Sequence, residues 1–186
     1  FQYSNDSWSQ LGSTIDGDNA GDYYGKSVSL SGDGTTVAIG AEGGYAEIWQ
    51  YSNNSWTQLG DDIDGDNAGD YFGNSVSLSD DGNIVAIGAL GDDYAGTDSG
   101  SVSIFQYSND SWSQLGSTID GEAAGDHYGS SVSLSADATI VAIGAIGNDY
   151  GVIDSGSVSI FSNSSKYFDD GDASFSINGN KSPGNY

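Results

Sequence analysis

Apolar and hydroxyl-bearing residues alternate in short stretches along most of the chain. At residues 75–79 a valine and a leucine fall on one side and serines on the other, which is the period of two expected of a β-strand. A tight turn at 80–83 leads to a more apolar strand at 84–89. Two further strands are predicted at 101–107 and 111–115, and no stretch has a sustained helical period. The pattern therefore predicts four short antiparallel strands in this part of the chain.

The same pattern returns along the sequence. The motif aromatic-Gln-Tyr-Ser begins at Phe1, Trp49 and Phe105, and a degenerate copy begins at Phe161, so the periods are 48, 56 and 56 residues. A period near 50 residues with four antiparallel strands is typical of a β-propeller blade. The sequence thus predicts an all-β fold of β-propeller-type blades, each of four antiparallel strands, as three repeats plus a partial one.

The repeats also predict how the chain is organised. We expect propeller repeats over residues 1–161, divided at 1–48, 49–104 and 105–160. Residues 162–186 leave the pattern, which indicates a linker and the start of a further β module. Three blades cannot close a ring and would leave strand edges and apolar faces bare. We therefore expect a larger propeller, completed by further blades of a parent chain or by a homo-oligomer.

Charge and composition narrow the range of partners. The chain has 27 Asp and Glu against 3 Lys and no Arg, a formal net charge of −24. This balance excludes binding to nucleic-acid phosphates, which needs clustered Lys and Arg, and argues against docking on an anionic membrane surface. No run approaches the roughly 18 apolar residues of a membrane span, so no membrane insertion is expected. Because the chain has no cysteine, disulfides, thiol chemistry and Cys-based zinc sites are excluded as well.

Three motifs of the second repeat carry a family resemblance. Gly-Asp-Tyr-Phe-Gly at 69–73 is followed by Ser-Val-Ser-Leu at 75–78 and by Val-Ala-Ile-Gly-Ala at 85–89. This combination resembles the FG-GAP repeat, which builds the seven-bladed propeller of integrin alpha subunits and occurs in large secreted bacterial and algal surface proteins. The resemblance extends from residue 1 to about residue 161. It implies an extracellular, secreted or cell-surface propeller used in adhesion or assembly, and it identifies no ligand.

One feature of that family is missing from this sequence. Its calcium-binding blades carry Asp-x-Asp/Asn-x-Asp-Gly-x-x-Asp between the first two strands. Around Asp81 the matching ligand positions hold Ser77, Ser79 and Val85, and the equivalent turns of the other two repeats are just as poor in carboxylates. One carboxylate per loop cannot supply the six to eight oxygens that Ca²⁺ takes. We therefore interpret these loops as plain turns.

A second set of acidic residues leaves metal binding open. Acidic residues recur at i, i+2 and i+6 in each connection between repeats: Asp16, Asp18 and Asp22; Asp64, Asp66 and Asp70; Asp120, Glu122 and Asp126. One interpretation is a Ca²⁺ or other hard-cation site per repeat, because close carboxylates repel unless a cation lies among them. The other, which the spacing favours, is a solvated loop whose carboxylates accept bonds from nearby backbone N–H groups. Two loops form a weaker third set, with the pairs Asp93/Asp98 and Asp149/Asp154.

The sequence gives little support to an enzyme. Its single histidine, His127, aligns with Tyr23 and Tyr71, which indicates an aromatic packing position rather than a catalytic base. The carboxylates recur with the repeat, as scaffold residues do, and none is singled out as one of a glycosidase pair. We expect no catalytic residue, and we expect the aromatic residues at this position of each repeat to pack between blades: Tyr23 and Tyr24, Tyr71 and Phe72, and Tyr128.

These observations favour a non-enzymatic, extracellular structural or adhesive segment that mediates surface attachment or assembly. Its partner would be a protein or glycan at a cell surface or in a matrix. Two alternatives remain open: a lectin-like propeller with one exposed Tyr or Trp per repeat, and a structural subunit of an extracellular filament. Five sequons occur, at Asn5, Asn53, Asn109, Asn163 and Asn180, against about 2.7 expected by chance. Three of them are copies of one repeat position, so the excess is no evidence for glycosylation.

Overall fold

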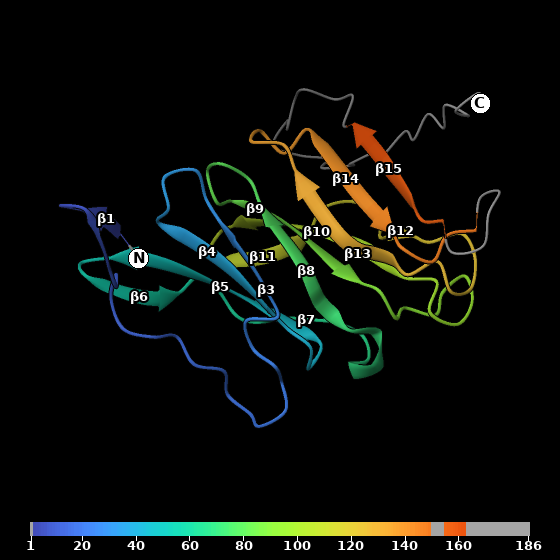
Figure 1. The fold of residues 1–186 in the computed structure, drawn as a ribbon, viewed down its shortest axis with the longest axis horizontal. Coiled ribbons are helices and arrows are strands. Elements are labelled where there is room, and N and C mark those ends of the chain that lie inside the picture. The colour runs from blue at the N-terminus through green and yellow to red at the C-terminus, as the bar shows by residue number, and fades with distance from the viewer. Residues whose placement is uncertain (1, 150–154, 163–186) are drawn as a thin grey trace.

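The computed structural model describes residues 2–149 and 155–162, which form an all-β fold of stacked antiparallel sheets (Figure 1). The first blade consists, in order across its sheet, of β3 (Ser27–Leu30), β4 (Thr36–Ala41), β5 (Tyr45–Ser52) and β6 (Ser55–Gln58). The second blade repeats this order with β8 (Phe72–Leu78), β9 (Ile84–Ala89), β10 (Ser101–Ser108) and β11 (Ser111–Gln114). The third contains β13 (Tyr128–Leu134), β14 (Ile140–Ala145) and β15 (Ser157–Ser162). The predicted fold class, propeller-type blades of antiparallel strands, is confirmed.

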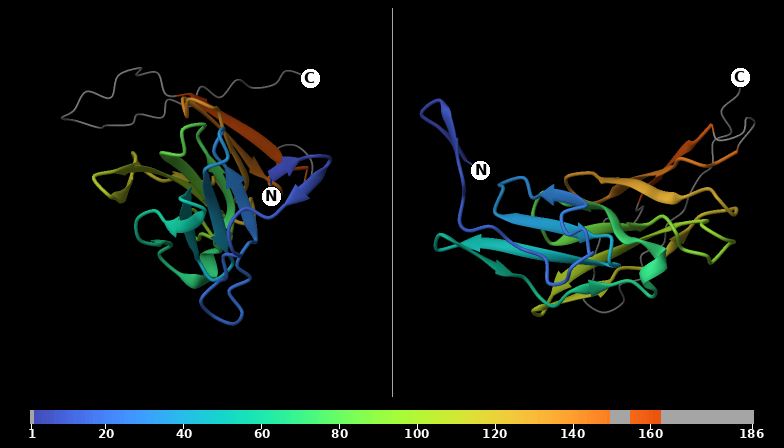
Figure 2. Two further views of the ribbon diagram at one scale, coloured as in Figure 1. Left: turned by 90° about the vertical axis from the view of Figure 1, so that its left-hand side faces the viewer. Right: turned by 60° about the horizontal axis from the view of Figure 1, so that its bottom comes forward.

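Four short strands and one helical turn complete the described structure. The hairpin of β1 (Gln2–Ser4) and β2 (Ser7–Ser9) has the register of the outer ends of β5 and β6, so it corresponds to the outer edge of a blade. The right-hand view of Figure 2 shows this hairpin standing apart from the blades. The sequence pattern did not predict β7 (Ile63–Asp64), β12 (Ile119–Asp120) and the 3₁₀ turn η1 (Ala68–Asp70), which lie in the connections between blades. Among the described residues no helix is long and apolar enough to span a membrane.

Apolar cores lie between consecutive blades. The first core joins residues of the first blade to residues of the second and to Ile63 of the connection: Ala38, Ala46, Ile48, Phe72, Val76, Leu78, Val85, Ile87 and Ala89. The second core repeats this arrangement between the second and third blades, with Ile84, Ala86, Val102, Ile104, Val141, Ile143 and Ala145. Alternate residues of the central strand β9 therefore enter different cores, and all six of its residues are buried.

In the first and second blades, serines of the first strand bond to the backbone of the next blade. Ser75 Oγ donates to the Gly129 carbonyl at 2.8 Å, and Leu134 N–H donates to Ser77 Oγ at 2.9 Å. The same two bonds join the first blade to the second, through Ser27 and Ser29 at 2.8 and 3.0 Å. The hairpin tips add a backbone bond at each interface, from Gly32 N–H to the Asp80 carbonyl and from Asp80 N–H to the Ala136 carbonyl, both at 2.8 Å. Each interface thus combines an apolar core with one repeated set of polar contacts.

The Val-Ala-Ile-Gly-Ala glycine allows this close approach of blades. A Cβ atom built on Gly88 would overlap the Gly129 carbonyl oxygen and Ser75 Oγ. A Cβ atom on Gly40 would overlap the Gly73 carbonyl oxygen in the same way. The glycine therefore leaves room for the serine–carbonyl bond, because any side chain would hold the inner strands apart.

The two end blades each leave one apolar face uncovered. Val28 and Leu30 of β3 are 66% and 61% exposed, whereas their counterparts Val76 and Leu78 are 8% and 6% exposed. We call this side of the first blade the upstream face. On the opposite end, Val158 and Ile160 of β15 are 70% and 66% exposed, whereas Val102 and Ile104 of β10 are 0% and 3% exposed. We call this side of the third blade the downstream face.

The expectation that all five repeated aromatic residues pack between blades is wrong for two of them. Phe72 and Tyr128 are buried and Tyr24 is half-buried, but Tyr23 and Tyr71 are exposed. Tyr23, Tyr71 and His127 share a left-handed backbone, with φ of 48°, 53° and 52°. This conformation turns the first aromatic residue of each pair out of the interface and directs the second one inward. The His127 ring lies beside Gly147, as the Tyr71 ring lies beside Gly91, but His127 is half-buried.

The close approach of the inner strands predicts the effect of a methyl group at Gly88. We expect Gly88→Ala to lower the free energy of unfolding by about 1–3 kcal/mol, because the added Cβ forces the second and third blades apart. Urea denaturation followed by circular dichroism measures this change. Gly69→Ala is the matched control, because a Cβ atom there meets nothing within 4 Å and the backbone needs no positive φ. Equal stability losses in the two variants would contradict this account of the interface.

Candidate functional site

The nine acidic residues that recur at i, i+2 and i+6 do not form compact groups of three in the described structure. Asp64 and Asp120 end the short strands β7 and β12, and Asp16 holds the same place in the first connection. The middle members are exposed: Asp18, Asp66 and Glu122. The last members accept hydrogen bonds near their own loops, with Tyr45 Oη at 3.1 Å from Asp22, Asn67 Nδ2 at 3.1 Å from Asp70 and Asn148 Nδ2 at 3.2 Å from Asp126. In the described part of the chain, none of the three trios brings one oxygen of each member within 4.8 Å of the others. Asp126 is 4% exposed and also accepts the Ala123 N–H at 3.1 Å, so this member is not solvated.

A different group of carboxylates does converge. One oxygen each of Asp18, Glu47 and Asp62 lies within 4.8 Å of the other two, and in the described residues no other such group of three or more acidic, His or Cys side chains occurs. We call this group the carboxylate cluster. Only Asp18 belongs to the nine predicted residues. Asp18 and Asp62 are exposed, whereas Glu47 is 4% exposed.

Two neighbouring side chains hold Glu47 in place. Its Oε2 accepts hydrogen bonds from Tyr24 Oη at 2.6 Å and from Trp49 Nε1 at 2.7 Å. Burial and the Glu47 carboxylate raise the pKa of the Tyr24 phenol well above its usual range, so Tyr24 remains a donor. Next to it, burial and a hydrogen bond to Asp22 raise the pKa of Tyr45 to about 12. The Tyr24 and Tyr45 rings stack with centroids 6.3 Å apart.

The carboxylate cluster belongs to the first blade only. In the second blade Ser103 and Thr118 occupy the places of Glu47 and Asp62, and their hydroxyl oxygens lie 3.1 Å apart. Both donors to Glu47 are also replaced by phenylalanine in that blade, by Phe72 and Phe105. These departures from the repeat are the sequence signal of the cluster, and a pattern of recurring acidic residues does not contain it.

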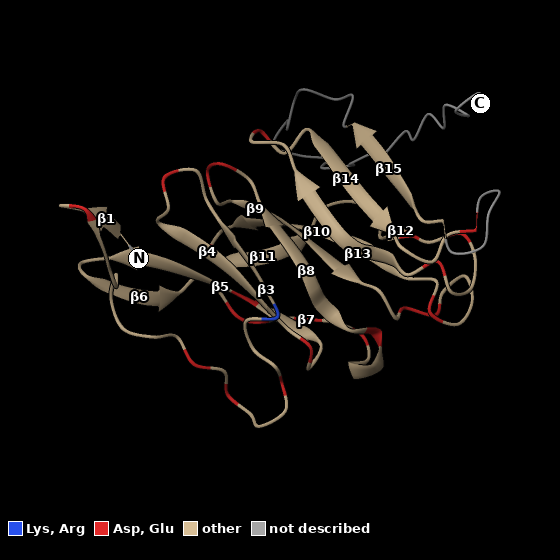
Figure 3. Cartoon of the chain, viewed as in Figure 1, with Lys and Arg blue, Asp and Glu red and all other residues tan. Residues whose placement is uncertain are grey.

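In the carboxylate cluster, the exposed Asp18 and Asp62 lie close to the buried Glu47, and like charges at this spacing repel. The residues of the cluster could hold a hard cation. Ca²⁺ takes six to eight oxygens, so all six oxygens of the three carboxylates would have to bind it, and Glu47 Oε2 already accepts two hydrogen bonds. Burial, followed by the nearby charge of Asp92, also raises the pKa of Asp120, so crowding of carboxylates is not confined to the cluster. Figure 3 shows that acidic residues gather mainly in the loops and connections, with Glu47 on β5 as an exception.

The turns between the first two strands use their carboxylate as an internal acceptor. Asp137 Oδ1 accepts bonds from Ser135 Oγ at 2.7 Å, Thr139 Oγ1 at 2.8 Å and Thr139 N–H at 3.1 Å. Asp33 and Asp81 make the matching bonds in the first and second blades. This geometry agrees with the interpretation as plain turns. The bonds from Ser135 and then Thr139 lower the pKa of Asp137 to about 2.

The remaining candidates occupy loops. Asp93 Oδ1 accepts the Asp98 N–H at 2.8 Å, so this pair supports its own loop. Asp149 is exposed, and its proposed companion Asp154 lies outside the described residues. Of the sequons, Asn5, Asn53 and Asn109 lie in exposed hairpin turns at positive φ, whereas Asn163 and Asn180 lie outside the described residues.

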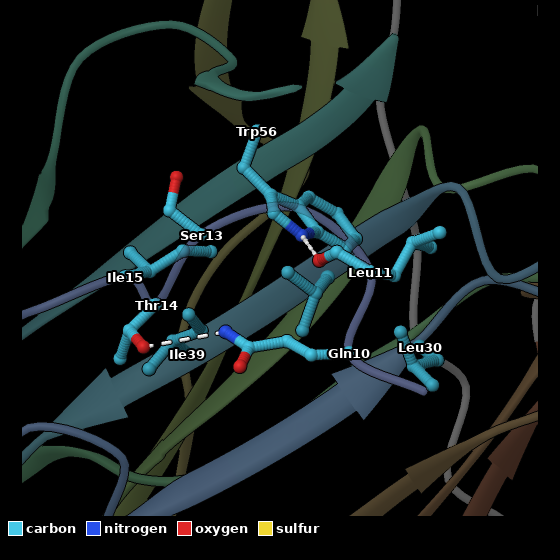
Figure 4. Close-up of a pocket in the computed structure, with 9 residues that line it drawn as sticks. Gln10, Leu11, Ser13, Thr14, Ile15, Leu30, Ile39 and Trp56 are labelled. Carbon is cyan, nitrogen blue, oxygen red and sulfur yellow. Dashed lines mark hydrogen bonds between the residues drawn. The ribbon is translucent and has the colours of Figure 1, made fainter. Parts of the chain in front are cut away.

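An apolar groove of about 340 Å³ lies on the upstream face of the first blade (Figure 4). Its lining comes from the connection and from the strands: Gln10, Leu11, Ser13, Thr14, Ile15, Leu30, Val37, Ile39 and Trp56. Trp56 Nε1 donates to the Leu11 carbonyl at 2.8 Å and thereby ties the connection to the blade. The exposed rings of Tyr23 and Tyr71 do not line this groove. We call it the upstream groove.

Charge repulsion in the carboxylate cluster predicts a response to salt. We expect NaCl and CaCl₂ at equal ionic strength to raise the thermal midpoint of a dialysed sample, because dissolved ions screen the repulsion. The gain should be smaller in Glu47→Ser/Asp62→Thr, which restores the hydroxyl pair of the second blade, than in the control Asp61→Ser/Asp66→Thr, which removes two exposed carboxylates. Scanning calorimetry measures both. An unchanged salt response in the cluster variant would count against repulsion, whereas an extra gain from Ca²⁺ that this variant abolishes would reveal a held cation.

The turn aspartates predict a loss of stability in acid. Hydrogen bonds hold the pKa values of Asp33, Asp81 and Asp137 below the unfolded value of about 3.9. For Asp81 these bonds outweigh its burial, which acts in the opposite direction. Their stabilisation is complete above about pH 5 and is lost as the pH falls through the folded values, which reach about 2 for Asp137. In urea titrations from pH 5 to pH 2, Asp137→Asn should lose less stability than the wild type or the exposed control Asp61→Asn. Parallel curves for all three proteins would refute this role.

The chain matches one family and resembles several solved structures in fold. The FG-GAP repeat family model matches residues 62–105 and 118–161, which include the first two strands of the second and third blades and part of the third strand. A candidate 6-phosphogluconolactonase of Bacteroides uniformis is 12% identical, with a TM-score of 0.52 over 82% of this chain and 38% of that chain. The corresponding Bacteroides fragilis protein is 15% identical, with a TM-score of 0.52 over 82% of this chain and 36% of that chain.

The chain therefore spans less than two fifths of the length of these structures, and at such identities the likeness concerns the fold alone. No curated protein matches the chain. The family match covers two consecutive units whose strands, turns and interfaces have the same geometry. With these repeats forming propeller-type blades, the chain is an FG-GAP repeat protein.

Proposed function

We propose that this chain is a non-enzymatic structural or adhesive segment of an extracellular or cell-surface assembly. The observation that carries the proposal is the pair of exposed apolar faces at the two ends of the blade stack. A side chain such as Val158 or Ile160 is largely exposed there, although its counterpart in an inner blade is almost completely buried. Contiguous apolar surface of this kind on a soluble protein marks a site of association.

The charge of the chain supports association through these faces. The residues that make each face apolar are uncharged, whereas the acidic residues lie mainly in loops and connections (Figure 3). A net charge of −24 disfavours unspecific contact between copies, because like charges repel over roughly a Debye length. The end faces are therefore the regions where attraction can exceed repulsion.

The repeated architecture supports a structural role rather than a catalytic one. The turn aspartates, interface serines and interface glycines each perform the same task in successive blades. Groups shared by all blades serve the scaffold, because a reaction centre needs a constellation that occurs at one place. The carboxylate cluster does occur at one place, in the first blade, but it combines no nucleophile with a base.

Light scattering on the 186-residue chain tests the proposal. We expect the weight-average mass to rise above 19.1 kDa with protein concentration, and to rise more at high NaCl, because salt screens the charge and leaves apolar attraction intact. A dilution series at two salt concentrations distinguishes reversible association from aggregation. A single 19.1 kDa species at every concentration and salt level would refute assembly through this chain.

A further inference from the structure

The two ends of the stack carry the opposite halves of one interface. Three hydrogen bonds recur at each internal interface. One serine of the earlier blade donates to a glycine carbonyl of the next blade, and a second serine accepts from a leucine N–H of the next blade. The third bond joins the backbones of the two hairpin tips. By repeat position, the downstream face presents the groups of the earlier blade through Ser131, Ser133 and Ala136. The upstream face presents the groups of the next blade through Gly25, Leu30 and Gly32.

The apolar halves match in the same way. Ile48 and Ile104 are 1% and 3% exposed, since each packs in the core against the following blade and its connection. The third isoleucine of this series, Ile160, is exposed on the downstream face. The upstream groove is the other half, because its Leu11 and Ile15 correspond to Leu59 and Ile63 of the first core.

We propose that the occupant of the upstream groove is a second copy of this chain, which inserts Ile160 of its downstream face. Val158 of that copy covers the exposed side of β3. Ser131 Oγ donates to the Gly25 carbonyl of the first copy, and Leu30 N–H of the first copy donates to Ser133 Oγ. The contact continues the internal interface of the blades with the same residue types in the same places. This inference rests on the proposed function and names the partner of that assembly.

The contact is heterologous, because it joins two different surfaces of the same chain. Each added copy still exposes one upstream and one downstream face, so copies extend head to tail or close into a ring when the rotation permits. An isologous dimer would bury two identical faces and would stop at two copies. This difference allows a mixing experiment to identify the contact.

The test blocks one face at a time. Leu30→Asp places a charge on the upstream face and Ile160→Asp on the downstream face, both at positions that are largely exposed in the single chain. A buried, unpaired carboxylate should weaken association at least about 100-fold. Tyr94→Asp is the matched control, because Tyr94 is 82% exposed in a loop of the second blade, which has no end face. Thermal melts establish that all variants are folded.

Sedimentation velocity at high NaCl gives the readout. We expect each blocked variant to remain monomeric at concentrations where the wild type and Tyr94→Asp associate. An equimolar mixture of the two blocked variants should form a one-to-one dimer and stop there, because one intact upstream face meets one intact downstream face. If one blocked variant alone still dimerises, or if the wild type associates and neither substitution matters, the head-to-tail contact is wrong while assembly stands. A wild type that stays monomeric would overturn the proposed function as well.

Discussion

A blade four strands wide and one sheet thick cannot bury both of its faces by itself, and the rest of this structure depends on that constraint. Burial requires a neighbour on each side, so the cores lie between blades rather than within them. The neighbour must also come close, because a serine of the first strand and a glycine of the second face its backbone. Gly88 and Ser75 meet this need together, since one removes a side chain and the other converts the resulting contact into a hydrogen bond.

The blade interfaces also explain why the chain can be so acidic. Cohesion comes from apolar contacts and from hydroxyl–backbone bonds, neither of which needs a cation. Among the described residues one salt bridge is formed, between Lys26 and Glu42 at 3.7 Å, and such exposed pairs contribute little. The surface loops are therefore free to carry a high negative charge that keeps partly folded chains apart. Within a blade, carboxylates support turns, as Asp137 does through its three short bonds.

The fold was predictable because its signal is repeated, and the candidate site was not because its signal occurs once. The strand at 84–89 was predicted at its observed bounds, and β8 extends three residues before the predicted start because a bulge between Phe72 and Ser75 interrupts the alternation. Glu47, Asp18 and Asp62 come from separate segments, and only the path of the chain shows that they converge. The outward turn of Tyr23 and Tyr71 depends on a left-handed backbone that side-chain patterns do not encode.

The uniformity of the blade interfaces has a consequence for how such a chain can evolve. Every junction uses the same atoms at the same repeat positions, so duplication or deletion of a whole unit leaves each remaining junction intact. None of these repeated contacts depends on the total number of blades. Unequal recombination between tandem copies can therefore lengthen or shorten the protein in single steps, and the number of blades becomes a quantity that selection can adjust without redesigning any residue.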